Sequence, residues 1–295
     1  MTGGEREALM ARNVTVASFL GPWEEGRLME ELRRAAGEHP DIIILPETWQ
    51  GKLLPIDAPI HLDMRQIAAQ HRVYIAQSVY LLENGKQYNS VLLFDRAGDL
   101  CGRYDKAYPY WGELTSDPAT QPGKSESVFS LDFGRVGAAV CFDANFPWLW
   151  QRMADEGAEL VLWPSAYAAG TQLQAHALNH HYPIVTATMS GDFIAVDIDG
   201  SFIRNISGRS RIERITLDLD RCIFHENFNT GLRDALLKET DPKVILEKKL
   251  LKEQWFILRS ARDDISAREV CCAAGMEELR AYKKRSLLEI DRLRR

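Results

Sequence analysis

The chain has 295 residues, of which 45% are hydrophobic and 26% are charged, and it contains seven tryptophans. This composition is typical of a soluble globular protein and excludes a disordered or fibrous chain. The net charge of -6, with both signs mixed along the chain, argues against non-specific nucleic-acid binding, because a phosphate backbone is bound by concentrated Lys and Arg.

The first part of the chain alternates short apolar runs with amphipathic stretches. After a polar end over residues 1–12, which we expect to be flexible, the apolar runs predict strands and the stretches with one apolar face predict helices. Strands are expected over residues 14–20, 41–45, 73–80 and 90–95, and helices over residues 24–38 and 61–71. The turn signal Glu83-Asn84-Gly85 predicts a hairpin between the last two strands.

A second set of similar elements follows a loop rich in Pro and Gly over residues 108–124. An apolar strand runs to Cys141; further strands are expected over residues 159–163, 184–189, 193–198 and 212–219, and helices over residues 146–156 and 172–181. Strands that alternate with helices predict an α/β layered protein, with helices covering the sheets. Two sets of this size suggest two sheets that share one core.

The character of the chain changes after Cys222. From about His225 to Arg295 it is rich in Lys and Glu, with apolar positions at helical spacing that include the cluster over residues 255–258. We therefore expect a helical extension over residues 223–295, packed on the core or on a partner subunit.

The five cysteines show no paired spacing, which favours a reducing compartment. The chain begins with a polar stretch, and no apolar run approaches the roughly eighteen residues of a membrane span. We expect a cytoplasmic protein that binds neither membranes nor nucleic acid.

Three residues at or near expected strand ends carry candidate chemistry, because strand ends are where α/β folds place their sites. Glu47 follows the strand over residues 41–45, Lys106 lies in the sequence Tyr104-Asp105-Lys106, and Cys141 ends its own strand. Taken singly, each has a simpler interpretation: a loop acid, a surface cation and a buried thiol.

Taken together, these residues lie in an ordered set of motifs. The set comprises Leu45-Pro46-Glu47, Arg103-Tyr104-Asp105-Lys106, Pro122-Gly123, Phe133-Gly134-Arg135-Val136-Gly137, Cys141-Phe142-Asp143, Phe146-Pro147 and Trp163-Pro164-Ser165. In this order the motifs resemble those of the nitrilase superfamily of carbon-nitrogen hydrolases. The resemblance covers residues 13–222, which we take as the hydrolase domain.

The resemblance implies a fold and a catalytic triad. The implied fold is α/β, a four-layer α-β-β-α sandwich with the helical extension added at its C-terminus. Cys141 would be the nucleophile and Glu47 the general base that takes its proton. The Lys106 ammonium and the backbone N–H of Phe142 would stabilise the charge that develops on the substrate oxygen. A thioester intermediate and release of ammonia or an amine are implied as well.

Further site residues follow less directly from the motifs. Members of the superfamily usually carry a second glutamate between the lysine and the cysteine, and Glu113 is the only carboxylate close after Lys106, although its spacing to Pro122-Gly123 is longer than usual. Asp143 is expected to hold the turn by accepting from backbone N–H groups. Candidate substrate contacts are Phe142, Tyr110, Trp111 and Tyr167.

The expected function is hydrolysis of an amide or N-carbamoyl compound, by a homodimer or larger homo-oligomer without a cofactor. Phe142-Asp143 resembles the amidase and carbamoylase branches, whereas true nitrilases tend to have Trp-Glu there. Nitrile hydrolysis and a non-catalytic scaffold remain alternatives, and a papain-like cysteine-histidine hydrolase is a weaker one. His176 and His180, four residues apart, suggest a metal site, but no acid lies between them, so we expect none.

Overall fold

The computed structural model describes residues 12–124, 126–208 and 211–295. Apart from Arg12, the end that we expect to be flexible lies outside these residues. The chain divides into two compact units, one over Val14–Thr216 and one that includes Leu217–Arg295. No helix among the described residues is both long and apolar enough to cross a bilayer.

The first unit contains two main sheets, and the first is built largely from the N-terminal half of the chain. In spatial order its strands are β13 (Ile212–Asp218), β1 (Asn13–Phe19), β2 (Ile42–Ile44), β4 (Tyr74–Glu83), β5 (Lys86–Phe94) and β6 (Leu100–Asp105), and β3 (Leu53–Pro55) also pairs with β4. The strands β1, β2 and β4 are parallel, whereas β5 and β6 extend the sheet by antiparallel hairpins. The hairpin predicted at Glu83-Asn84-Gly85 is confirmed.

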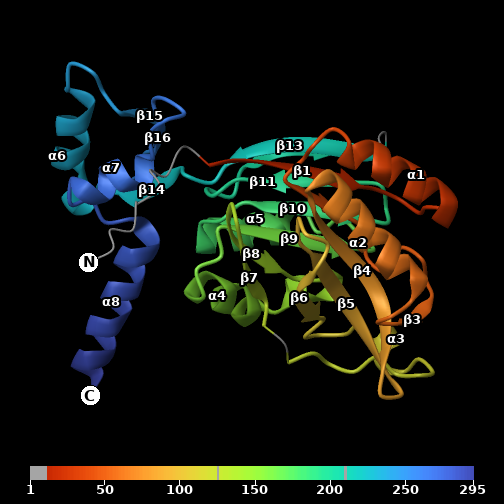
Figure 1. The fold of residues 1–295 in the computed structure, drawn as a ribbon. Helices are drawn as coiled ribbons and strands as arrows, with labels where there is room; N and C mark the ends of the chain where they lie inside the picture. The colour runs from red at the N-terminus through yellow and green to blue at the C-terminus, as the bar shows by residue number, and fades with distance from the viewer. Residues whose placement is uncertain (1–11, 125, 209–210) are drawn as a thin grey trace, which may run out of the picture. The chain divides into compact units, whose positions relative to one another are not determined.

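The helices α1 (Glu25–Ala36) and α2 (Pro59–His71) pack together on this sheet (Figure 1). Their buried faces contribute Leu28, Leu32 and Met64 to an apolar core shared with Ile43 and Ile75 of the strands. The side chain of Glu24 caps α1 by accepting from two backbone N–H groups, which fixes where the helix begins.

The second sheet is built from the middle of the chain. Its strands in spatial order are β12 (Phe202–Ile206), β11 (Phe193–Val196), β10 (Ile184–Thr188), β9 (Leu160–Ser165), β8 (Gly134–Ala138) and β7 (Val128–Leu131). The helices α4 (Pro147–Asp155) and α5 (Thr171–His180) lie against each other beside this sheet. The ring of Trp150 in α4 stacks on His176 in α5 at 4.2 Å, and the hydroxyl of Tyr182 donates to the carbonyl of Trp150. The prediction of a mixed α/β fold with two sheets is therefore confirmed.

The two sheets meet through buried contacts as well as apolar packing. The hydroxyl of Ser18 in β1 donates to the carbonyl of Thr186 in β10 at 2.6 Å. The strand β2 of the first sheet and the parallel strands β8 and β9 of the second sheet each lead, at their carboxyl ends, into segments that carry Glu47, Cys141 and Ala166. The sheets thus bring residues that are about 120 positions apart in sequence to one place: the backbone N–H of Ala166 donates to Glu47 at 2.8 Å.

The expectation of an entirely helical C-terminal segment is wrong. A three-stranded sheet lies there, formed by β14 (Cys222–His225), β16 (Trp255–Ser260) and β15 (Val244–Leu250), together with the helices α6 (Glu226–Leu237), α7 (Ala267–Ala273) and α8 (Leu279–Arg294). Phe256, Ile257 and Leu258 are all fully buried, and a short apolar run buried on both faces cannot be distinguished from a helix by its periodicity. The helix α8 is present as expected (Figure 1).

Candidate active site

Glu47 lies in a tight turn just after β2. The turn is held by the next residue, Thr48, which adopts a left-handed backbone with φ of 40° and donates its N–H to the hydroxyl of Ser78 at 3.0 Å. A β-branched residue rarely adopts this conformation, so the surrounding contacts must stabilise it. The Glu47 carboxylate is buried, and hydrogen bonds from Lys106 and from the N–H of Ala166 fix its direction.

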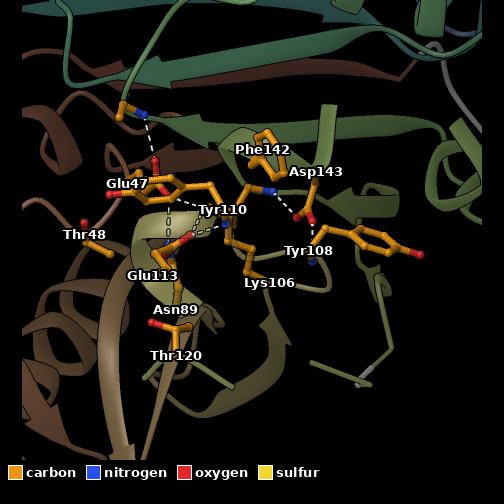
Figure 2. A network of polar contacts seen from close by, with 12 residues as sticks. Glu47, Thr48, Asn89, Lys106, Tyr108, Tyr110, Glu113, Thr120, Phe142 and Asp143 are labelled. Carbon is orange, nitrogen blue, oxygen red and sulfur yellow. Dashed lines mark hydrogen bonds and ion pairs between the residues drawn. The ribbon is translucent and has the colours of Figure 1, made fainter. Parts of the chain in front are cut away.

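Lys106 is the first residue after β6, and its side chain is fully buried. Its Nζ lies 2.9 Å from Oε1 of Glu47 and 2.7 Å from Oε2 of Glu113 (Figure 2). Burial alone lowers the pKa of this lysine, but the facing Glu47, Cys141 and Glu113 outweigh burial and raise the pKa above its ordinary value. Lys106 therefore keeps its positive charge and does not act as a general acid.

Glu113 belongs to the short helix α3 (Trp111–Leu114). Its carboxylate accepts from the backbone N–H of Tyr110 at 3.0 Å, the contact that an acid in a first helical turn makes with the residue before the helix. The side chain is 3% exposed. The structure therefore brings Glu113 to the same ammonium as Glu47, despite its unusual spacing from Pro122-Gly123.

The motif Pro122-Gly123 packs against the backbone of the segment that carries Lys106. The N–H of Gly123 donates to the carbonyl of Lys106 at 2.9 Å, and a Cβ added to Gly123 would lie 2.1 Å from the carbonyl oxygen of Asp105. Only glycine fits so near to the backbone of the lysine segment.

Glu47, Lys106 and Glu113 form a carboxylate cluster together with Asn89 of β5. The motifs did not indicate Asn89. Its Nδ2 donates to Oε1 of Glu47 at 2.8 Å and to Oε1 of Glu113 at 2.7 Å, and its backbone carbonyl accepts from the N–H of Lys106 (Figure 2). The only available signal was a polar residue just before the apolar run of β5 over residues 91–94.

Cys141 begins a short 3-10 helix over Cys141–Asn145, so the expected strand ends earlier, at Ala138. The cysteine adopts a left-handed backbone with φ of 49° and is 7% exposed. Burial, assisted by the Glu47 carboxylate, raises the pKa of the thiol to about 12, although Lys106 and the N–H of Ala166 oppose this rise. The thiol is therefore protonated at neutral pH and needs a base to remove its proton.

Asp143 is fully buried in the turn that follows. Its carboxylate accepts from the hydroxyl of Tyr104 at 2.7 Å and from the N–H of Val140 at 2.8 Å. It also accepts from the N–H of Tyr108 at 2.9 Å (Figure 2). These contacts confirm that Asp143 holds the turn, and they also tie it to both sides of Lys106. Burial raises the pKa of Asp143 to about 7, against the opposing effect of its hydrogen bonds.

The four expected substrate contacts differ in their surroundings. Lys106 Nζ lies 5.7 Å from the ring centre of Tyr110, and burial raises the pKa of Tyr167. Phe142 packs edge-on against Phe146. Trp111 is 77% exposed, so the structure does not bring it into the cluster.

Tyr80 is a further residue that the motifs did not indicate. It pairs directly with Asn89 across β4 and β5, so both side chains project from the same face of the sheet. Burial and the charges of Glu113 and Glu47 raise the pKa of its hydroxyl, which is therefore neutral. Its place in the strand expected over residues 73–80, where successive side chains point to opposite faces, was the only signal in the sequence.

The two histidines of α5 have other partners. His176 stacks on Trp150 and donates Nε2–H to the carbonyl of Ala144, and His180 is buried beside Tyr182. Within the described ranges, no group of three or more His, Cys, Asp and Glu side chains is arranged to hold a metal ion.

Comparison with known proteins identifies the family. The family model for carbon-nitrogen hydrolases matches residues 19–221, more than half of the chain. The chain belongs to the carbon-nitrogen hydrolase family. The resemblance to the nitrilase superfamily that the motifs indicated is thereby confirmed.

Similar carbon-nitrogen hydrolases with curated activities include amidases. The deaminated glutathione amidase of Yersinia enterocolitica is 29% identical, over 46% of this chain and 54% of that protein. The N-carbamoylputrescine amidase of Arabidopsis thaliana is 24% identical, over 68% of this chain and 70% of that protein. The chain spans about half the length, or less, of the first few curated relatives that it matches.

Solved structures of the family share the fold. A Saccharomyces cerevisiae member of the nitrilase superfamily is 17% identical with a TM-score of 0.63, and the match covers 78% of this chain and 97% of that one. An amidase from Nesterenkonia sp. is 19% identical with a TM-score of 0.61, over 79% and 99% of the two chains. In a mutant of that amidase, the acetamide moiety of fluoroacetamide is covalently attached to the active-site cysteine.

Proposed function

We propose that this chain hydrolyses a non-peptide C–N bond in an amide or N-carbamoyl compound, through a thioester on Cys141. One observation carries the proposal: a fully buried ammonium, that of Lys106, is paired with the two buried carboxylates of Glu47 and Glu113 beside a protonated thiol. Burying three charges costs several kcal/mol per ion in desolvation, roughly, so a fold that needed only stability would place apolar residues there.

The proposed reaction begins with transfer of the thiol proton of Cys141 to Glu47 while the sulfur attacks the carbonyl carbon. The electron pair of the C=O bond moves to oxygen, where the Lys106 ammonium and the N–H of Phe142 stabilise the charge. The C–N bond then breaks, and the leaving nitrogen takes the proton from Glu47, which gives ammonia or an amine and a thioester.

Water completes the cycle. Glu47 removes a proton from water as the oxygen attacks the thioester, and the sulfur leaves and takes the proton back. Glu113 is proposed to orient the substrate and to help deliver the proton to the leaving amine. Phe142, Tyr110, Trp111 and Tyr167 are proposed as substrate contacts, with Trp111 at the outer edge because of its exposure.

The relatives support this choice of substrate class. The similar curated proteins that are named above are amidases, one of them acting on an N-carbamoyl compound by its name. The covalent adduct on the cysteine of the Nesterenkonia amidase fits a thioester route. We extend the family's architecture in the same way: a four-layer α-β-β-α sandwich over residues 13–222, in subunits that associate as a homodimer or larger homo-oligomer.

Ammonia release from panels of amides, N-carbamoyl amino acids and nitriles tests the proposal. Wild type should act on amides or carbamoyl compounds, Cys141→Ala should be inactive, and Cys101→Ala, which changes an exposed cysteine, should retain activity. Activity confined to nitriles would favour a nitrilase. Equal activity in Cys141→Ala would reject the mechanism, and a chain with no activity and a Cys141 no more reactive than Cys101 would be a scaffold.

A further inference from the structure

The amide of Asn89 uses both of its donor hydrogens on carboxylates. One goes to Glu47 at 2.8 Å and the other to Glu113 at 2.7 Å, while Lys106 donates to the same two groups. The side chain is fully buried. The two carboxylates are therefore joined twice: by the neutral amide of Asn89 and by the charged ammonium of Lys106.

The acceptor end of the same amide has no hydrogen-bond partner among the described residues. Buried polar atoms are nearly always paired, and leaving one unpaired is costly. An asparagine kept only to support the strand would be expected to use its oxygen as well as its nitrogen. Its orientation at this position is set by the two carboxylates.

The donors around the carboxylates are complementary to negative charge on both. Glu47 accepts from Asn89, Lys106 and the N–H of Ala166. Glu113 accepts from the same asparagine and lysine and from the N–H of Tyr110. Two carboxylates that share one ammonium would otherwise repel each other, and such pairs commonly retain a proton on one member.

We propose that Asn89 is a positioning residue that holds Glu47 and Glu113 together as carboxylates around Lys106, so that the base carries no proton when the substrate arrives. This inference rests on the proposed function, in which Glu47 is the base. The titratable groups that face the two carboxylates from neighbouring elements are Lys106, Cys141, Tyr80, Tyr110 and Tyr167. None of the three tyrosines supplies a positive charge that would replace the donors of Asn89.

The test compares Asn89→Leu, which removes the donors at similar volume, with Gln87→Leu. Gln87 lies two residues earlier on β5, is also buried, and donates its amide to the hydroxyl of Thr120 at 2.8 Å instead of to a carboxylate. Both variants lose one buried amide on the same face of the strand, so a purely structural effect should be similar in the two.

Two readouts are measured against pH: kcat/KM for the best amide, and the rate of iodoacetamide alkylation at Cys141 followed by peptide mass spectrometry. In Asn89→Leu the acidic limb of both profiles should move up by about one pH unit, because a hydrogen bond to the charged form favours that form. At neutral pH kcat/KM should fall about tenfold or more. Gln87→Leu should leave both limbs in place.

An unmoved acidic limb in Asn89→Leu would overturn the proposal, whatever the loss of activity. If that variant does not fold, Asn89→Ala is measured in the same way and judged by the same limb. If wild type hydrolyses no compound in the panels, the proposed function fails, but the alkylation profiles still decide whether Asn89 holds the base unprotonated.

Discussion

The hydroxyl of Tyr104 donates a 2.7 Å hydrogen bond to the Asp143 carboxylate, and both side chains are fully buried. Tyr104 lies two residues before Lys106, and Asp143 lies two residues after Cys141. The same hydroxyl also accepts from the N–H of Ala107 at 3.1 Å. The pair therefore joins the segment that carries the ammonium to the turn that carries the thiol.

Tyr104→Phe should weaken this connection. The variant leaves the N–H of Ala107 without its partner and removes one of the three hydrogen bonds that the buried Asp143 carboxylate accepts. We therefore expect the free energy of unfolding to fall by about 1–3 kcal/mol. We also expect a lower kcat, because the positions of Lys106 and Cys141 relative to each other are no longer fixed by this hydrogen bond. Urea unfolding and steady-state kinetics measure both effects.

Tyr74→Phe is the matched control for that change. Its hydroxyl is also largely buried and accepts one backbone N–H, that of Asp132, at 3.3 Å, well away from the carboxylate cluster. It should lose some stability and keep its kcat. Equal kcat in wild type and Tyr104→Phe would contradict a role for the Tyr104–Asp143 pair in positioning Lys106 relative to Cys141.

Stability should depend on pH through Asp143. Its pKa is raised to about 7 by burial, whereas an unfolded aspartate titrates near about 3.9. Between these values the folded chain keeps a proton that the unfolded chain releases, so this group stabilises the fold most at acidic pH and the contribution is lost as pH rises through 7. The free energy of unfolding of wild type, relative to Asp143→Asn, should therefore decrease between about pH 5 and about pH 8.

Urea unfolding of both proteins across that range provides the measurement. A difference that grows with pH would show that Tyr104 and the two N–H donors overcome burial and keep Asp143 ionised.

Lys106→Met should abolish most activity and destabilise the fold. The variant leaves the carboxylates of Glu47 and Glu113 buried beside each other without a cation, which we expect to cost about 3–5 kcal/mol at neutral pH. Turnover should fall by a factor of about 10² or more, because the developing oxyanion loses its charged donor. Lys52→Met removes a lysine from an exposed ion pair with Glu25 and should change the free energy of unfolding by less than about 1 kcal/mol.

Acid should restore part of the stability of Lys106→Met, since protonation removes the repulsion between its carboxylates. Thermal unfolding at neutral and acidic pH measures this recovery. A variant as stable as wild type at neutral pH would contradict the role of Lys106 as the shared counter-ion.

Gly123→Ala should displace the backbone of the segment that carries Lys106. The added methyl group would lie 2.1 Å from the carbonyl oxygen of Asp105, so the backbone must move, and we expect a loss of more than about 1 kcal/mol together with lower turnover. Gly231→Ala, in α6, meets nothing within 4 Å and should be neutral or slightly stabilising. Chemical unfolding of the two variants compares them, and equal stability would argue against close packing at Gly123.

The sequence predicted the parts of the site that strand ends and local turns determine. Glu47 and Cys141 each follow an apolar run, and α/β folds place their sites at the carboxyl ends of such strands. Lys106 was indicated by the motif around it, because it follows the antiparallel strand β6, which is not an apolar run. Glu113 was found through its closeness to Lys106 in the chain. These inferences needed only the order of elements and the residue types.

Other parts depend on contacts between distant segments. Asn89 lies just outside the strand expected over residues 90–95, and nothing near it in sequence indicates the two carboxylates and the ammonium that the segments after β2 and β6 and the helix α3 place around it. The left-handed backbones of Thr48 and Cys141 have no glycine to signal them. The sequence does not distinguish the strand β16 from a helix, because burial on both faces removes the alternation of apolar and polar residues that marks a strand.

The exposure of Trp111 has a consequence for changing what this protein accepts. Tyr104, Asn89 and Asp143 lie in a network where one lost donor disturbs the lysine or the thiol, whereas the Trp111 side chain is mostly in water. A mutant library confined to Trp111 and Tyr167, which is 36% exposed, should therefore yield mostly folded proteins. If the proposed substrate contacts are right, laboratory evolution of new substrate preferences should begin at Trp111 and Tyr167 and leave Asn89 and Lys106 unchanged.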